Sequence, residues 1–160
     1  MNRPQRLRPS TIAELRELIG KPLPPTAWVT VGQENIDAFA DATGDHQWIH
    51  IDPTRAANSE FKSTVAHGLY TLSLIPAMLD TIISLDGFAH TLNYGYDKVR
   101  FPAPLAVSSR FRMHAVVDSV EAVGPGSAHM LTTVRFDREG SDKPVCVAVQ
   151  ASRFVEGLNR

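Results

Sequence analysis

The stretch His67-Gly-Leu-Tyr-Thr-Leu-Ser-Leu-Ile-Pro-Ala-Met-Leu-Asp-Thr-Ile-Ile-Ser-Leu85 decides the fold. It is apolar on almost every face, which predicts one helix over residues 67–85 that other elements enclose. We expect Ser63 or Thr64 to cap its start. Pro76 lies inside it, removes one backbone hydrogen bond and should kink the helix. The polar residues that interrupt the run favour burial in protein over a bilayer.

From Leu92 onward the pattern changes to strands in which apolar and polar residues alternate. Gly124-Pro-Gly126 and Glu139-Gly140 are typical of the turns between them. An antiparallel meander wrapped around one apolar helix is an α+β design. The apolar sets are Phe111, Met113, Ala115 and Val117; Ala128, Met130, Thr132, Val134 and Phe136; and Val145, Val147, Val149 and Ala151.

The first half of the chain predicts short helices. A capping box from Thr11 to Glu14, with Gly20 as a stop, predicts a helix over residues 12–19. Residues 28–31 form a short strand, and residues 32–43 a helix that Gly44 ends. Asp52 and Pro53 then begin another helix. The segment 45–51 is therefore expected to be a loop between two helix ends, a common place for chemistry.

Composition predicts one domain over residues 1–160, with residues 1–25 as an N-terminal extension. The chain is 43% hydrophobic, 21% charged and has a net charge of −1, so phosphate neutralisation of a nucleic acid is not expected. The single cysteine, Cys146, excludes an intrachain disulfide and a cysteine-rich zinc site, and favours the cytoplasm. Arg3, Arg6 and Arg8 precede no apolar run, unlike a secretory signal. We expect no membrane association.

Asp45 and His50 are the first candidates for chemistry. A carboxylate and an imidazole in one loop can act as an acid/base pair on one water molecule. The alternative is that Asp45 only caps a turn and His50 is a polar residue whose hydrogen bonds are satisfied. The spacing His46-x-x-x-His50-x-Asp52 also fits zinc ligands on a helix, but Asp52 is better used as an N-cap, so we expect no metal. No phosphate-binding glycine loop and no Gly-x-Ser-x-Gly elbow is present.

His67 and Gly68 open the apolar helix. The free N–H groups of a helix start can stabilise an oxyanion, and glycine allows close approach; the alternative is that glycine only relieves packing.

Three separated segments resemble one family. Phe39-Ala-Asp-Ala-Thr-Gly-Asp45 with His50, Asp52-Pro53 and Ala56 resembles the signature of (R)-specific enoyl-CoA hydratases and MaoC-like dehydratases. Val65-Ala-His-Gly68 and Lys98-Val-Arg-Phe-Pro-Ala-Pro104 follow in the expected order. The segment Gly44-Asp-His-Gln-Trp-Ile-His50 is most similar to the NodN-like branch of this family.

The resemblance implies a hot dog fold, in which an antiparallel sheet wraps one long helix. It also implies a homodimer with active sites near the subunit interface. Asp45 and His50 would hold and activate a catalytic water, and the Gly68 N–H would bind a thioester carbonyl. Coenzyme A or acyl carrier protein would enter as part of the substrate, and no other cofactor is expected.

Further substrate contacts are expected at Trp48 and His67. The family usually has Asn-Pro where this chain has Gln47-Trp48, so we expect Trp48 to narrow the acyl pocket. Lys98 and Arg100 are candidates for the carrier's phosphates, or else solvated strand charges. Pro76 stands where relatives carry a small polar residue. The functional hypothesis is hydration of a 2-enoyl thioester; the alternatives are a hot dog thioesterase and a non-catalytic acyl-binding module.

Overall fold

The computed structural model describes residues 6–157. Arg3, part of the basic N-terminal stretch, lies outside the described residues. The helices are α1 (Ile12–Arg16), α2 (Gln33–Thr43), α3 (Trp48–Ile51), α4 (Pro53–Ala57), α5 (Gly68–Ser73) and α6 (Ile75–Asp80). The strands are β1 (Val29–Thr30), β2 (Phe88–Arg100), β3 (Arg110–Gly124), β4 (Ser127–Arg138) and β5 (Cys146–Glu156).

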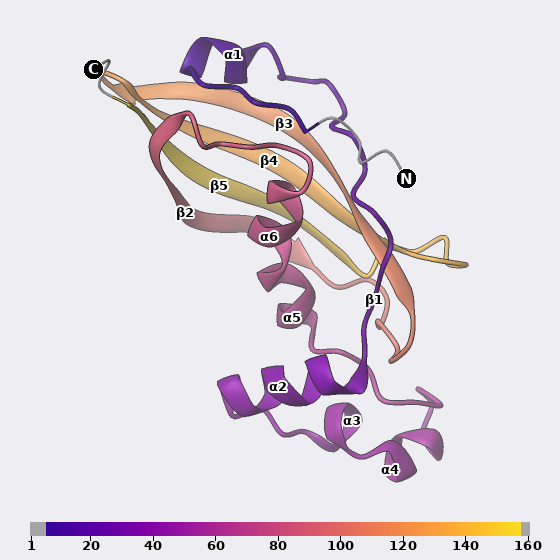
Figure 1. Ribbon diagram of the computed structural model, residues 1–160. Coiled ribbons are helices and arrows are strands. Elements are labelled where there is room, and N and C mark those ends of the chain that lie inside the picture. The colour runs from indigo at the N-terminus through magenta and orange to yellow at the C-terminus, as the bar shows by residue number, and fades with distance from the viewer. Residues whose placement is uncertain (1–5, 158–160) are drawn as a thin grey trace.

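The sheet is antiparallel and curls around α6, while α2, α3 and α4 form a separate layer at the far end of α5 (Figure 1). Its strand order is β1-β3-β4-β5-β2. Only β3, β4 and β5 are a meander, because β2 returns to pair with the free edge of β5. The second half of the chain turns to strands at Phe88, the start of β2, and not at Leu92 as the sequence predicted.

The apolar segment 67–85 is two helices and not one. α5 ends at Ser73, and α6 starts at Ile75 with Pro76 in its first turn, where a missing N–H is tolerated. The capping prediction was wrong: His67 occupies the N-cap position without a side-chain bond, and the Thr64 hydroxyl donates to Gln33 instead. Among residues 6–157, no helix is long and apolar enough to cross a bilayer.

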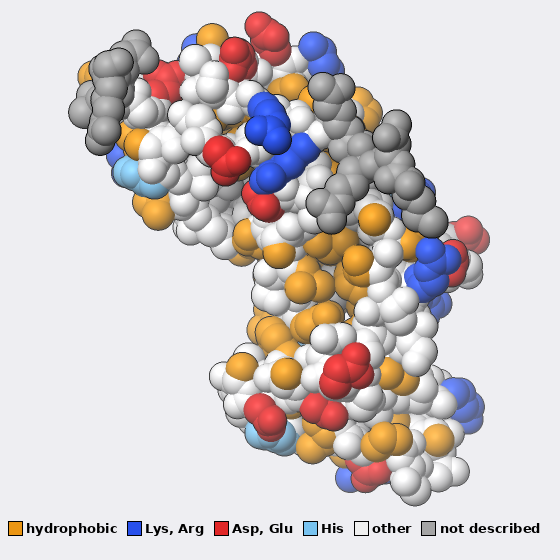
Figure 2. All heavy atoms as spheres, in the orientation of Figure 1, with side chains coloured by type: hydrophobic (Ala, Val, Ile, Leu, Met, Phe, Trp, Pro, Cys, Tyr) orange, Lys and Arg blue, Asp and Glu red, His pale blue; other side chains and the backbone are white. Residues whose placement is uncertain are grey.

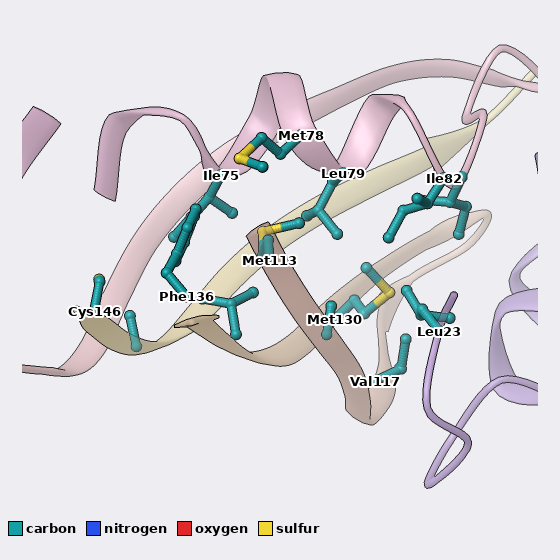
Figure 3. Packing of buried hydrophobic residues seen from close by; sticks show 14 of the residues in the cluster. Leu23, Ile75, Met78, Leu79, Ile82, Met113, Val117, Met130, Phe136 and Cys146 are labelled. Carbon is teal, nitrogen blue, oxygen red and sulfur yellow. The ribbon is translucent and has the colours of Figure 1, made fainter. Parts of the chain in front are cut away.

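The core lies between α6 and the concave face of the sheet. Figure 3 shows Ile75, Leu79 and Ile82 on the helical side, facing Met113, Met130 and Phe136 from the strands. The inward faces predicted for β3 and β4 are confirmed. The alternating set Val147, Val149 and Ala151 predicted for β5 was wrong by one residue, because Ala148, Gln150 and Ser152 point inward.

The N-terminal helix is shorter than the sequence predicted. α1 stops at Arg16, and Ile19 lies beyond it, bridged to Val117 of β3. The strand at residues 28–31 is β1, the helix ended by Gly44 is α2, and the helix that begins at Asp52-Pro53 is α4, as predicted.

Candidate active site

Asp45 lies at the turn that follows α2. The helix ends at Gly44, whose φ of +76° is left-handed and whose N–H donates to the Ala40 carbonyl at 2.8 Å. Glycine adopts this conformation without the strain that a Cβ would add. The turn leaves the Asp45 side chain 57% exposed. Its carboxylate is therefore accessible to water and to a ligand.

His50 lies in α3, where the sequence predicted only a loop, and it is buried. Its Nδ1 lies 2.6 Å from the carbonyl oxygen of Val65. Because a carbonyl only accepts, Nδ1 carries the hydrogen, and Nε2 of the neutral ring is an acceptor. Burial lowers the pKa of His50 below the ordinary histidine value. The ring therefore stays neutral at neutral pH.

Gln33, near the start of α2, ties these elements together. Its amide nitrogen donates to the His50 carbonyl at 2.8 Å, and its amide oxygen accepts from the Thr64 hydroxyl. The sequence reasoning missed this residue because its partners lie 17 and 31 positions away, beyond any local pattern. Gln33 fixes α3 against both α2 and the segment that leads into α5.

His67 completes the cluster. Its Nε2 donates to the Asp45 carbonyl at 2.9 Å and lies 3.9 Å from the Asp45 carboxylate. The ring stacks on His50 with centroids 3.6 Å apart, and Phe39 of α2 lies 5.1 Å from it. Only 4% of the side chain is exposed. His67 thus positions both Asp45 and His50. Its position at the start of a helix did not predict this role.

Gly68 is the first residue of α5, so its N–H has no partner within the helix. A Cβ on Gly68 would lie 2.7 Å from the ring of Phe101. The ring therefore packs directly onto the glycine, which explains the absence of a side chain there. Phe101 follows β2, and the sequence reasoning gave it no role in the site.

A cleft of about 350 Å³ joins these groups. On the other side of Gly68 and Phe101 lies a second hollow of about 260 Å³, bordered by Thr71 and Val145. Gly68 and Phe101 line both, so they form the wall between them. The cleft is lined by Phe39, Thr43, Asp45, His50, His67, Gly68, Leu69 and Phe101.

The other predicted residues lie outside this cleft in the described chain. Trp48 packs under Arg55, whose guanidinium carbon lies 4.3 Å from the ring centroid. Lys98 and Arg100 are exposed near the end of β2, and Arg100 donates to the Val99 carbonyl at 2.7 Å. Their contacts with substrate remain a prediction.

The spacing His46-x-x-x-His50-x-Asp52 does not form a ligand cluster in residues 6–157. His46 pairs with Asp41 at 2.9 Å, and Asp52 caps α4 by accepting from the Arg55 N–H at 2.9 Å. The group that comes together is Asp45, His50 and His67, whose ligand atoms all lie within 4.8 Å of one another. Two nitrogens and a carboxylate are donors that zinc accepts.

Residues 14–139 match the family model for the MaoC like domain. The chain belongs to the MaoC-like family. It is 43% identical over 145 residues to 3-hydroxyacyl-thioester dehydratase Z of Mycobacterium tuberculosis, covering 91% of this chain and 96% of that relative. Nodulation protein N of Rhizobium leguminosarum bv. viciae is 40% identical over 142 residues, covering 86% and 87%. The MaoC-like and NodN-like resemblance is thereby confirmed.

Solved structures confirm the fold of this MaoC-like chain. The unliganded R-hydratase from Pseudomonas aeruginosa superposes with a TM-score of 0.69 at 21% identity, covering 94% of this chain and 92% of that one. The curled sheet around α6 is thus a hot dog fold, as the resemblance implied.

Proposed function

We propose that this MaoC-like chain catalyses the reversible addition of water to a trans-2-enoyl thioester, giving a (3R)-3-hydroxyacyl thioester. One observation carries the proposal: the Asp45 carboxylate and His50 line the same cleft as Gly68. Relatives named 3-hydroxyacyl-thioester dehydratase and 3-hydroxybutyryl-CoA dehydratase support the same reaction class.

The two acceptors suit one water molecule. Asp45 and the unprotonated Nε2 of His50 each accept one of its hydrogens, which directs the oxygen lone pair toward C3. Asp45 takes a proton as the C3–O bond forms. The π electron pair of the alkene moves to C2. The proton that Asp45 took from water then passes to C2 by way of the Nε2 of His50, which restores the Asp45 carboxylate and the neutral imidazole. One O–H bond and the π bond break, and one C–O and one C–H bond form.

Negative charge builds on the thioester oxygen while C2 gains carbanion character. The Gly68 N–H is the donor that we assign to that oxygen, a contribution of about 3 kcal/mol for one such donor. Asp45 and His50 are held in place by His67, which contacts the backbone of one and the ring of the other. Neither step calls for a metal or a redox cofactor.

We also propose a cytoplasmic homodimer that takes the acyl group on coenzyme A or on acyl carrier protein. Strand β2 is an edge strand of the sheet in residues 6–157 and exposes Leu92 and Tyr94, and Leu69 of α5 is 59% exposed. Figure 2 shows hydrophobic side chains gathered at the narrow middle of the molecule, where α5 and α6 lie. Lys98 and Arg100 are the proposed contacts for the carrier's phosphates.

The test is hydration of crotonyl-CoA and longer 2-enoyl-CoAs, followed by loss of the enoyl absorbance and chiral analysis of the product. Asp45→Asn should lower kcat by at least about a hundredfold, because it removes the base and keeps the size. Asp41→Asn, on the exposed face of α2, is the matched control and should hydrate at the wild-type rate. Release of free thiol without hydration would establish a thioesterase, and binding without turnover an acyl-binding module.

A further inference from the structure

A third hollow, which we call the deep pocket, lies between α6 and the concave face of the sheet. It measures about 260 Å³. Its helical side includes the apolar residues Pro76, Leu79 and Ile83 and the acid Asp80. Its floor on β4 and β5 includes Met130 and Phe154 and the polar residues Thr132, Gln150 and Ser152. Buried polar side chains are normally satisfied by hydrogen bonds with their neighbours.

Thr132 and Gln150 each have a buried polar atom that finds no hydrogen-bond partner among residues 6–157. The Thr132 hydroxyl and the Gln150 amide oxygen are buried without a hydrogen bond, although the two side chains are 0% and 3% exposed. The residues sit opposite each other in the pairing of β4 with β5, so both point to the same face. Two adjacent buried polar groups without partners cost stability, and a ligand that hydrogen-bonds both would remove that cost.

The charges at the pocket narrow the choice of ligand. The ionisable groups that line it are two acids, Asp80 and Asp86, of which Asp80 pairs with Arg6 and Asp86 accepts from Ser84. Asp86 has no cationic partner among residues 6–157, so a carboxylate tail beside it is disfavoured. A hydroxyl or keto oxygen is neutral and matches a threonine hydroxyl and an amide, which both donate and accept.

The catalytic cleft and the deep pocket lie against successive helices, α5 and α6. Gly68 opens α5 and lines the cleft, while Pro76 lies in the first turn of α6 and lines the deep pocket. The eight positions between them correspond to about 12 Å at 1.5 Å per residue. An extended acyl chain advances about 1.25 Å per carbon–carbon bond, because its bonds form a tetrahedral zigzag, so it needs about ten bonds to cover that distance.

We propose that the deep pocket receives the far end of the substrate's acyl chain, and that Thr132 and Gln150 select a chain that carries a hydroxyl or keto oxygen there. The inference rests on the proposed function and names its substrate class: long 2-enoyl thioesters oxygenated far from the thioester. Thr132 and Gln150 determine specificity and take no part in the chemical step.

The test compares a 2-enoyl-CoA of about twelve carbons with its terminally hydroxylated analogue, a length chosen to exceed the ~12 Å path. The wild-type protein should favour the hydroxylated chain in kcat/KM by roughly tenfold or more. Thr132→Val and Gln150→Leu should each reduce that preference by about threefold to tenfold, since each removes one hydrogen bond. Neither residue lines the catalytic cleft, so the rate with crotonyl-CoA should not change.

Thr133→Val is the matched control. Thr133 is the next residue on β4, is exposed on the opposite face of the sheet, and donates to Asp118 at 2.7 Å. This variant should leave the preference unchanged. The Tm of Thr132→Val and of Gln150→Leu should stay level or rise, because an unpaired buried polar group is removed. A fall in Tm would mean that the pair stabilises the fold through bound water, which overturns the assignment.

Binding separates this inference from the proposed function. The saturated twelve-carbon acyl-CoA and its hydroxylated analogue cannot be hydrated, so their Kd values report on the pocket alone. Hydratase activity with equal Kd values for the two chains overturns the deep-pocket proposal and leaves the proposed function standing. Tighter binding of the hydroxylated chain by a protein that hydrates nothing refutes the proposed function and supports the pocket.

Discussion

The catalytic corner, formed by Asp45, His50, His67 and Gly68, and the deep pocket beneath α6 differ in how their buried polar groups are held. In the corner, each buried imidazole donates to a backbone carbonyl, at 2.6 Å for His50 and 2.9 Å for His67, while the buried second ring nitrogen of His67, Nδ1, finds no partner among residues 6–157. In the deep pocket, the Thr132 hydroxyl and the Gln150 amide oxygen find none in that range either. The difference indicates that the two carbonyl contacts fix the catalytic rings before substrate arrives, whereas the polar floor of the pocket is completed by a ligand.

Such a division suits an enzyme that must position water and also choose among acyl chains. Fixed hydrogen bonds hold catalytic groups in a reactive arrangement without reorganisation. Unpaired groups discriminate strongly, because a ligand that lacks the matching oxygen leaves them unsatisfied.

The largest effect should come from removing an acceptor in the corner. His50→Ala removes one of the two acceptors for the catalytic water and should lower kcat by at least about a hundredfold. His46→Ala is the control, since His46 pairs with Asp41 on the surface. Enoyl-CoA hydration and Tm are measured for both variants. A His50→Ala protein with near wild-type turnover would show that the corner is only a structural cluster.

The next effect concerns the wall between the cleft and its neighbouring hollow. Gly68→Ala places a methyl group 2.7 Å from the Phe101 ring, which is partly exposed and can swing outward. We expect kcat/KM to fall by roughly tenfold to a hundredfold, because the thioester loses its close approach.

Gly68→Ala combined with Phe101→Ala distinguishes two reasons for the glycine. The double variant has room for the new methyl group, but that group still obstructs the thioester. It should therefore remain as slow as Gly68→Ala. Recovery of wild-type kcat/KM would mean that Gly68 serves only the packing of Phe101.

Much of the catalytic corner could be predicted because its signals are local. Gly44, Asp45, His50 and the Asp52-Pro53 helix start lie within ten residues, and turn and capping chemistry acts over that distance. The contributions of Gln33 and Phe101 were not predictable, because each meets its partner only after the chain has folded. Pro76 predicted a kink in the helix over residues 67–85, but only the structure shows that this segment forms two helices, α5 and α6.

The deep pocket was missed for a different reason. The sequence of β5 carries valines at alternate positions, and Val147 and Val149 were expected to face the core. The strand pairs with β4 one residue out of that phase, so Ala148 and Gln150 face inward. A shift of one residue exchanges the two faces of a strand. Gln150 therefore lines the floor of the pocket, whereas the predicted phase would have placed it on the surface.

A smaller effect appears in the pH dependence of stability. Burial lowers the pKa of His50, so below about pH 6.5 the unfolded chain takes up a proton that the folded chain does not. His50 therefore makes the free energy of unfolding fall as the pH drops below that value. The hydrogen bond to Asp41 raises the pKa of His46, so its stabilisation is present at low pH and is lost as the pH rises through the raised value.

Urea unfolding between pH 5 and 7.5 separates these contributions. His50→Gln should flatten the loss of stability on the acid side, and His46→Gln should steepen it. The comparison uses slopes against pH, because the absolute stability of His50→Gln also reflects the lost bond to Val65. Equal slopes in the two variants would contradict a buried, neutral His50.

The smallest effect on kcat should come from treating the protein with a metal chelator. Asp45, His50 and His67 offer a set of donors that fits zinc, but the proposed reaction uses Asp45 and His50 as free acceptors for water. Treatment with a chelator should therefore change kcat by less than about twofold, because a metal ion that takes no part in the reaction does not alter its activation free energy. Added Zn²⁺ should inhibit, because it would occupy the same acceptors.

Stoichiometric zinc in the purified protein, with activity lost on its removal and restored on its return, would instead make the corner a metal centre. The contrast with the deep pocket would then need a new explanation, because the corner too would be completed by a ligand.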